Sequence, residues 1–386
     1  MDITGIICEY NPLHVGHKKQ LDIIRQQHPD TGIVCLMSGN YVQRGAPAIL
    51  DKSARAEAAI RCGADLVLEL PITAALSSAE GFAAEGVRIL GGFCTRLCFG
   101  AETGSKESLL QTARMLLSDA FPDALRKRLE EGLSFPAARQ AALADLGADT
   151  DTLSLPNDIL ATEYCKAILQ QGLSMEPMPI VRQGGYHDLE ADSENPSATA
   201  IRRLLLEGGS WLDHIPDQAR DLLIKETPHI LSAGEKAILY RLRTMADAEY
   251  EALPFGSEGL WRKLMHNARK HATLEEIIAA TKSKRYTRTR LDRMVMCAFL
   301  GITQADMNLP APYVRVLALN DTGREILKTA RKTGRFPNAG ESVDSPYQEL
   351  EYRAGMVYSL FSTGVCSIDL EKNRRICYKT PETTQP

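Results

Sequence analysis

The chain has 386 residues, enough for two or three domains, and 44% of them are hydrophobic and 24% charged, as in an ordinary soluble globular protein. A net charge of −4 argues against a uniformly basic nucleic-acid binder, while leaving room for local basic patches. No apolar run has membrane length and no basic leader precedes the first strand, so we expect no membrane association and a cytoplasmic location.

The first predicted strand, residues 3–8, runs into the motif around which the chain is organised. A turn at Asn11-Pro12 follows, and then His14-Val15-Gly16-His17 opens an amphipathic helix. Free N–H groups at a helix start favour anions, and the two imidazoles with Lys18 and Lys19 suit a polyphosphate. Histidines three residues apart also arise by chance on surfaces, but this position after a buried strand favours nucleotide binding.

Strands and helices alternate after the motif. Strands are predicted at residues 32–37, 65–70, 96–99 and 178–182, and helices at 51–62, 77–91 and from 155 onward. This alternation predicts an α/β fold with a Rossmann-like, doubly wound parallel sheet. The charged helices expected at 105–146 are interpreted as a helical insertion. Loops after parallel strands are where such sheets bind ligands, which makes Asn40 and Arg44 candidate substrate contacts.

Three later positions are further candidates for the same site. Gly100 directly follows a strand and suits contact with adenine or ribose, although a simple turn explains it nearly as well. Asn157 stands near a helix start, where a capping role and a nucleotide contact are about equally supported. Ser197-Ala198-Thr199 begins a helix that carries Arg202, whose planar, permanently charged guanidinium matches phosphate geometry.

Taken together, these motifs resemble the His-x-Gly-His nucleotidyltransferases and, within them, the bacterial tRNA(Met) cytidine acetate ligase family. The resemblance rests on residues 5–20, 37–45, 68–71, 99–104, 156–160, 185–188 and 197–202. It implies activation of acetate by ATP to acetyl-adenylate, then acetyl transfer to N4 of the wobble cytidine of elongator tRNA(Met). It also implies the ATP contacts Ile7, Cys8, Glu9, Tyr10, Asn11, Pro12, Leu13, His14, Val15, Gly16, His17, Lys18, Lys19, Gln20, Gly100, Asn157 and Arg182.

The rest of the chain has a different character. A helix and a Pro-bearing link, residues 213–230, are expected to lead away from the nucleotide domain. Residues 258–293 carry ten basic and four acidic side chains, which favours a nucleic-acid footprint over a solvated helix face. The candidate tRNA contacts are Lys282, Lys284, Arg285, Arg288 and Arg290. We expect a catalytic domain at 1–230 and a smaller, mostly helical tRNA-binding domain at 231–386, completed by a strand at 313–319.

In the expected mechanism a carboxylate attacks the α-phosphate of ATP, and catalysis is mainly positioning and electrostatic stabilisation. His14 and His17 would act near the α- and β-phosphates, with Arg202 and Lys18 or Lys19 on the leaving pyrophosphate. Mg²⁺ would arrive with ATP, because no acidic cage is visible, and the nine scattered cysteines make no metal site. The rivals are a small-molecule adenylyltransferase of the pantetheine-phosphate or nicotinamide-mononucleotide type, and a non-catalytic RNA-binding protein with a regulatory nucleotide pocket.

Overall fold

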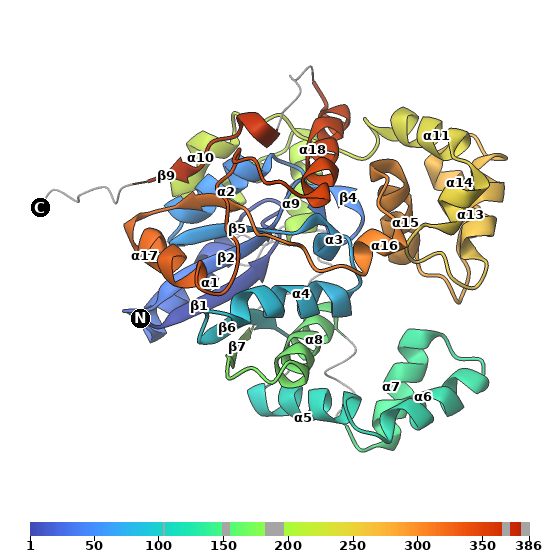
Figure 1. Ribbon diagram of the computed structural model, residues 1–386, viewed down its shortest axis with the longest axis horizontal. Coiled ribbons are helices and arrows are strands. Elements are labelled where there is room, and N and C mark those ends of the chain that lie inside the picture. The colour runs from blue at the N-terminus through green and yellow to red at the C-terminus, as the bar shows by residue number, and fades with distance from the viewer. Residues whose placement is uncertain (103–104, 149–154, 182–196, 365–370, 380–386) are drawn as a thin grey trace, which may run out of the picture.

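A seven-stranded sheet forms the centre of the molecule in the computed structural model, which describes residues 1–102, 105–148, 155–181, 197–364 and 371–379. The strand order is β7-β6-β1-β2-β5-β8-β9, and β5 and β8 are antiparallel, whereas the other neighbouring pairs are parallel (Figure 1). The strands are β1 (Ile3–Cys8), β2 (Gly32–Ser38), β5 (Leu66–Leu70), β6 (Arg96–Ala101), β7 (Glu176–Val181), β8 (Val316–Leu319) and β9 (Cys377–Tyr378). A separate hairpin joins β3 (Tyr41–Val42) to β4 (Ala46–Pro47).

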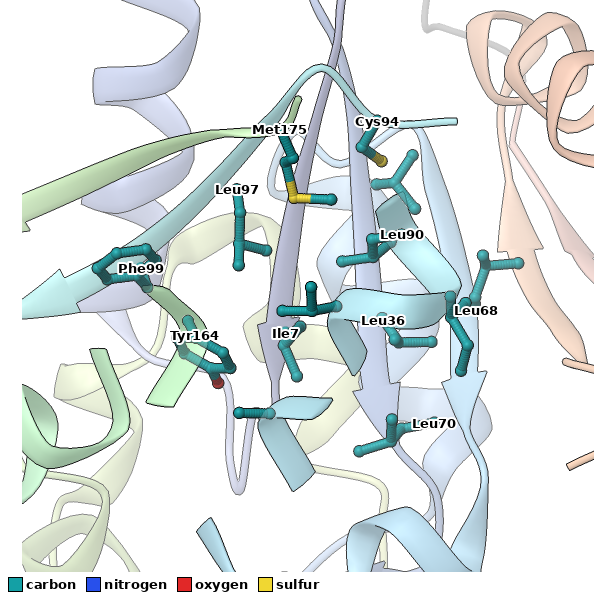
Figure 2. Close-up of a cluster of buried hydrophobic side chains, with 14 of the residues drawn as sticks. Ile7, Leu36, Leu68, Leu70, Leu90, Cys94, Leu97, Phe99, Tyr164 and Met175 are labelled. Atoms are coloured by element: carbon teal, nitrogen blue, oxygen red, sulfur yellow. The ribbon is translucent and has the colours of Figure 1, made fainter. Parts of the chain in front are cut away.

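Helices cover both faces of the sheet, because the central strands are apolar on both sides. One face packs against α4 (Ala79–Gly91), α5 (Lys106–Leu116), α8 (Pro156–Gln170) and α17 (Asp321–Ala330). Figure 2 shows this core, where Leu90 of α4 and Tyr164 of α8 lie over Ile7 and Leu36 of the sheet. The other face packs against α1 (Val15–Gln27), α2 (Lys52–Arg61), α9 (Ala198–Glu207) and α10 (Asp217–Leu223).

The prediction of a doubly wound α/β sheet is confirmed, and so is the helical character of the insertion. Each strand predicted before residue 182 is present within two residues of its expected limits over the described part. The insertion consists of α5, α6 (Phe121–Glu130) and α7 (Phe135–Asp145). The chain winds from β1 to β2 in one direction, while β6 lies on the other side of β1. The order therefore reverses beside β1, which is where open α/β sheets bind ligands.

The expectation that the strand at 313–319 completes a separate C-terminal unit is wrong. That strand, β8, pairs with β5 of the central sheet, with Leu319 opposite Leu66 and Val316 opposite Leu68. β5 is apolar except at Glu69 and needs a hydrogen-bonding partner on its outer side, which the distant β8 supplies. A division of the chain at residue 230 therefore does not separate the sheet from the rest of the protein.

The mostly helical character expected after residue 231 holds for residues 235–307. This helical unit comprises α11 (Glu235–Thr244), α12 (Asp247–Glu251), α13 (Leu260–Ala268), α14 (Leu274–Thr281), α15 (Arg288–Leu300) and α16 (Gln304–Met307). The unit lies to one side of the sheet, on the right in Figure 1, and has its own apolar core, to which α18 (Pro346–Tyr358) contributes. The short elements α3 (Ile72–Ala75), η2 (Trp211–His214), η3 (Ser359–Phe361) and η4 (Glu371–Asn373) complete the described chain. Within the described ranges, none of the helices is long and apolar enough to cross a membrane.

A buried cluster of charges fixes the C-terminal segment to the start of α2. Arg374 donates to both carboxylate oxygens of Asp51, at 2.8 and 2.7 Å, and its side chain is only 4% exposed. Glu371 pairs with Arg374 at 3.3 Å and with Lys52. Burial opposes ionisation of Asp51, but Arg374 outweighs it and holds the pKa of this carboxyl well below its ordinary value.

Candidate active site

A cleft of about 500 Å³ opens where the strand order reverses. Its wall includes the turn after β1, the end of β6, and the starts of α8 and α9. The β3–β4 hairpin and residues 229–231 close its remaining side. Such a volume is in the usual range for a small-molecule site, and its lining combines apolar side chains with a few convergent polar groups.

Two histidines cap the helix that begins at the cleft. His14 is the N-cap of α1, and its Nδ1 accepts from the Gly16 N–H at 3.1 Å. His17 Nδ1 in turn accepts from the His14 N–H at 3.3 Å, so the two rings complete a capping box, with their centroids 3.7 Å apart. Because Nδ1 is an acceptor in both rings, each imidazole carries its proton on Nε2. Both histidines line the cleft, and their Nε2–H groups are donors suited to phosphate oxygens.

The turn that carries the histidines is held by contacts that sequence reasoning missed. Asn11 Oδ1 accepts from the Ile49 N–H at 2.7 Å, and the fully buried Arg55 donates to the Glu9 carbonyl at 2.6 Å. At Gly16, a Cβ atom would lie 3.0 and 3.1 Å from atoms of the His14 ring. Gly16 therefore lets the imidazole fold back over the helix start, in addition to opening the backbone to a ligand.

The second motif meets the first across the cleft. Ser197 caps α9, with its Oγ accepting from Ala200 N–H at 3.0 Å. From the second turn of that helix, Arg202 donates to the Asn11 carbonyl at 2.7 Å and to Thr199 Oγ1 at 3.1 Å. A guanidinium is thus held beside the turn that presents His14 and His17, as the sequence predicted.

At the other end of the cleft, an amide is fixed in an apolar wall. The wall includes Phe99, Leu160, Tyr164 and Ile180. Beside it, Asn157 donates from Nδ2 to Glu102 Oε1 at 2.8 Å and from its backbone N–H to Glu102 Oε2 at 3.2 Å. The N-cap of α8 is Leu155, so Asn157 is not the cap, and it lines the cleft with its Nδ2 held by Glu102.

Comparison with known proteins identifies the family. A model described as HIGH Nucleotidyl Transferase matches residues 1–373. The tRNA(Met) cytidine acetate ligase of Clostridium novyi (strain NT) is 36% identical over 357 residues, which cover 87% of this chain and 89% of that protein. The enzyme of the same name from Alkaliphilus metalliredigens is 37% identical over 87% of both chains. The chain belongs to the tRNA(Met) cytidine acetate ligase family.

Solved structures agree with this assignment. The apo crystal structure of Thermotoga maritima TmcAL superposes with a TM-score of 0.89, is 29% identical, and covers 98% of this chain and 100% of that one. A second Thermotoga maritima TmcAL structure, bound with alpha-thio ATP, gives a TM-score of 0.86 at 30% identity, with the same coverage. The family resemblance and the fold predicted from sequence are both confirmed.

Most residues expected to contact ATP line the cleft. These are Ile7, Cys8, Glu9, Tyr10, Asn11, His14, Gly16, His17, Lys19, Gln20, Gly100 and Asn157, together with the catalytic candidate Arg202. Pro12, Leu13, Val15 and Lys18 do not line it: Leu13 is buried in the core against the sheet, and Lys18 pairs with Asp22 on α1. Arg182 lies outside the described residues. The loop candidate Asn40 is buried and accepts from the Lys52 N–H at 3.1 Å, whereas Arg44 lines the cleft.

The predicted tRNA contacts lie around the start of α15, on the helical unit. Arg285 pairs with Glu258, Arg288 pairs with Glu275 and Asp292, and Arg290 donates to the Phe255 carbonyl at 2.9 Å. Lys282 and Lys284 are exposed and make no ion pair with any described residue. Three of the five candidate tRNA contacts are therefore engaged within the protein, and Lys282 and Lys284 are the two most available cations among them.

Proposed function

We propose that this chain activates acetate with ATP as acetyl-adenylate and transfers the acetyl group to N4 of the wobble cytidine of elongator tRNA(Met). The observation that carries the proposal is the meeting of two phosphate-binding motifs, the His14–His17 helix start and Arg202, in one cleft of a member of the tRNA(Met) cytidine acetate ligase family. An enzyme with this substrate works where tRNA is, in the cytoplasm.

In the first step an acetate oxygen attacks the α-phosphorus of ATP and pyrophosphate leaves. Negative charge on the phosphate oxygens grows in the transition state, so donors already in place stabilise that state more than the ground state. The Nε2–H groups of His14 and His17 act on the α- and β-phosphates, and Arg202 and Lys19 act on the departing pyrophosphate. The described residues contain no group of three His, Cys, Asp or Glu side chains suited to a metal, so Mg²⁺ is assigned to the nucleotide it accompanies.

Base selection is assigned to Asn157, as oriented by Glu102. With Nδ2 donating to Glu102, we assign Oδ1 as the acceptor for the base, which suits the exocyclic amine of adenine but not the carbonyl of guanine. Substituting Glu102→Ala is expected to free the amide to rotate and to reduce the preference for ATP over GTP at least tenfold. Acetate-dependent pyrophosphate exchange with each nucleotide measures this preference. Glu107→Ala, an exposed acid on α5, is the control, and an unchanged preference in Glu102→Ala would refute the assignment.

The exposed lysines at the start of α15 are assigned to tRNA phosphates. The double substitution Lys282→Ala and Lys284→Ala is expected to weaken tRNA binding and to lower the slope of log affinity against log salt by up to about 1.4–1.8. Filter binding at several salt concentrations measures both quantities. Lys328→Ala, on α17 and paired with Glu325, serves as a control for the loss of a surface lysine and is expected to leave the slope unchanged. An unchanged slope in the double variant would remove this face from the tRNA footprint.

The decisive test of the function combines two assays on the purified protein. The proposal predicts pyrophosphate exchange that requires acetate. It also predicts that mass analysis detects N4-acetylcytidine in elongator tRNA(Met) after incubation with ATP and acetate. Exchange that requires a phosphorylated metabolite instead would make the protein a small-molecule adenylyltransferase. Binding of ATP and tRNA without release of pyrophosphate would make it a regulatory RNA-binding protein.

A further inference from the structure

One end of the cleft is walled by two segments that the proposed nucleotide contacts do not use. The first is the β3–β4 hairpin, which contributes Val42 and Pro47, and the second is the link at residues 229–231. Apart from Gln43, Arg44 and His229, their side chains on the cleft are apolar. Apolar walls of this kind suit the face of a flat ring better than a phosphate or a carboxylate.

This end of the cleft adjoins the phosphate-binding turn. The His229 N–H donates to the Ile49 carbonyl at 2.8 Å, and the Ile49 N–H donates to Asn11 Oδ1 at 2.7 Å. A single residue, Ile49, therefore joins the link to the turn that presents His14. A group bound beside His229 is thus a neighbour of whatever the histidines of α1 hold.

The same end of the cleft also adjoins the basic face of the helical unit. Gly45, in the hairpin turn, has φ +73°, and a Cβ atom there would lie 2.4 Å from the Arg293 nitrogen. The hairpin is therefore packed directly on the backbone of α15, whose first residue is Arg288. Two exposed lysines, Lys282 and Lys284, stand just before α15, so charge complementarity favours an RNA strand as the occupant of this end of the cleft.

His229 is the one titratable side chain of the link that lines this end. It is 8% exposed, its ring stacks on Tyr358 of α18 at 4.0 Å and 8°, and its Nδ1 is buried without a hydrogen-bond partner among the described residues, which leaves Nε2 as the nitrogen for a group in the cleft. Burial lowers its pKa from the ordinary 6.5, against the opposing charge of Asp51 and a contact with the Thr227 carbonyl. Asp51 is itself paired with Arg374, so the imidazole is neutral at pH 7 and can accept a proton.

We propose that this end of the cleft receives the unstacked cytosine of the acceptor RNA, and that His229 accepts the proton lost by its exocyclic amine. The inference rests on the proposed function. N4 attacks the carbonyl carbon of acetyl-adenylate, a C–N bond forms, and the bond from that carbon to the phosphate oxygen breaks, with the electron pair leaving on AMP. The proton from N4 passes to the His229 imidazole and then to solvent.

The test separates the two steps of the reaction in one variant. His229→Gln is expected to keep acetate-dependent pyrophosphate exchange within about twofold of the wild type, while single-turnover transfer to tRNA slows by about 10²–10⁴-fold. His28→Gln, at the far end of α1, is the matched control and is expected to change neither step. Equal transfer rates in His229→Gln and His28→Gln would overturn the proposal. A parallel loss of both steps would overturn it too, by giving His229 a purely structural role.

Two further readouts distinguish proton acceptance from support of the fold. Transfer by the wild type is expected to fall at pH values below the lowered pKa of His229, and the Gln variant is expected to lack this fall. Imidazole added to His229→Ala is expected to restore transfer in proportion to its concentration. Absence of both effects would contradict the assigned role.

The position of the acceptor base has its own variant. Ala46→Phe, on β4 of the hairpin, is expected to fill this end of the cleft, blocking acetylation of tRNA but sparing exchange. Loss of exchange in Ala46→Phe would instead place acetate or pyrophosphate there, against the proposal. A wild-type protein without acetate-dependent exchange would count against the proposed function. Normal exchange in the wild type together with normal transfer in the His229 variants would count against the further inference alone.

Discussion

Substituting His14→Asn or His17→Gln is expected to slow acetyl-adenylate formation by about 10²–10³-fold each, with tRNA affinity unchanged. Asparagine is a good N-cap and glutamine is the usual partner at the third helical position, so both variants preserve the capping box of α1. What they remove is the Nε2–H that each imidazole is proposed to donate to the phosphates. The comparison therefore separates the chemical role of the histidines from their structural one.

Acetate-dependent pyrophosphate exchange measures the first step, and filter binding measures tRNA affinity. His28→Gln, at the C-terminal end of the same helix, controls for the loss of an imidazole as such. If either capping variant exchanged at the wild-type rate, its histidine would be a helix cap without a part in catalysis. If tRNA affinity fell together with exchange, the substitution would have disturbed the fold.

Substituting Arg374→Ala is expected to destabilise the protein by about 3–5 kcal/mol, because it removes the cation paired with Asp51 and one of the two cations paired with the buried Glu371. Urea unfolding measures the loss. Lys328→Ala, which breaks the exposed pair with Glu325, is the control and is expected to change stability by less than about 1 kcal/mol. An effect of Arg374→Ala as small as that of the control would show that the cluster does not fasten the C-terminal segment.

The effect of Arg374→Ala is expected to depend on pH in a definite direction. In the wild type the pKa of Asp51 is depressed, so the stability it contributes is present above its unfolded-state pKa of about 3.9 and is lost as the pH falls through its folded-state value. In the variant the uncompensated carboxylate takes up a proton more readily. The stability difference between the two proteins is therefore expected to shrink as the pH falls below about 4.

Local patterns in the sequence were sufficient for the strands of the sheet before residue 182 and for the position of the His14–His17 motif at a helix start. β1, β2 and β6 are apolar runs that end in glycine or polar turns, and the His14–His17 motif stands where a helix must begin. The order in which strands occur along a doubly wound sheet then brings the ends of β1 and β6 together. The same arrangement brings Arg202 beside the turn at Asn11, a contact that the sequence did not specify.

Contacts between segments that are far apart in the sequence could not be predicted from local patterns. The residues of β8 predict a strand, but nothing in them specifies β5 as the partner. The link before residue 231 was expected to lead away from the nucleotide domain, whereas His229 bonds to Ile49 and returns to the cleft. Lys18 carries a charge that suits a phosphate, but Asp22 lies one helical turn further along α1 and forms an ion pair with it.

The antiparallel pairing of β5 with β8 has a consequence for how the chain is made. Leu70 leaves the ribosome roughly 250 residues before Val316, which at about 5–20 residues per second is an interval of about 12–50 s. Throughout that time the growing sheet carries an apolar edge with unpaired backbone groups, the kind of surface that recruits other nascent chains. Translation speed and chaperone supply are thus expected to limit the yield of folded protein, and a fragment that stops at residue 230 keeps this edge permanently.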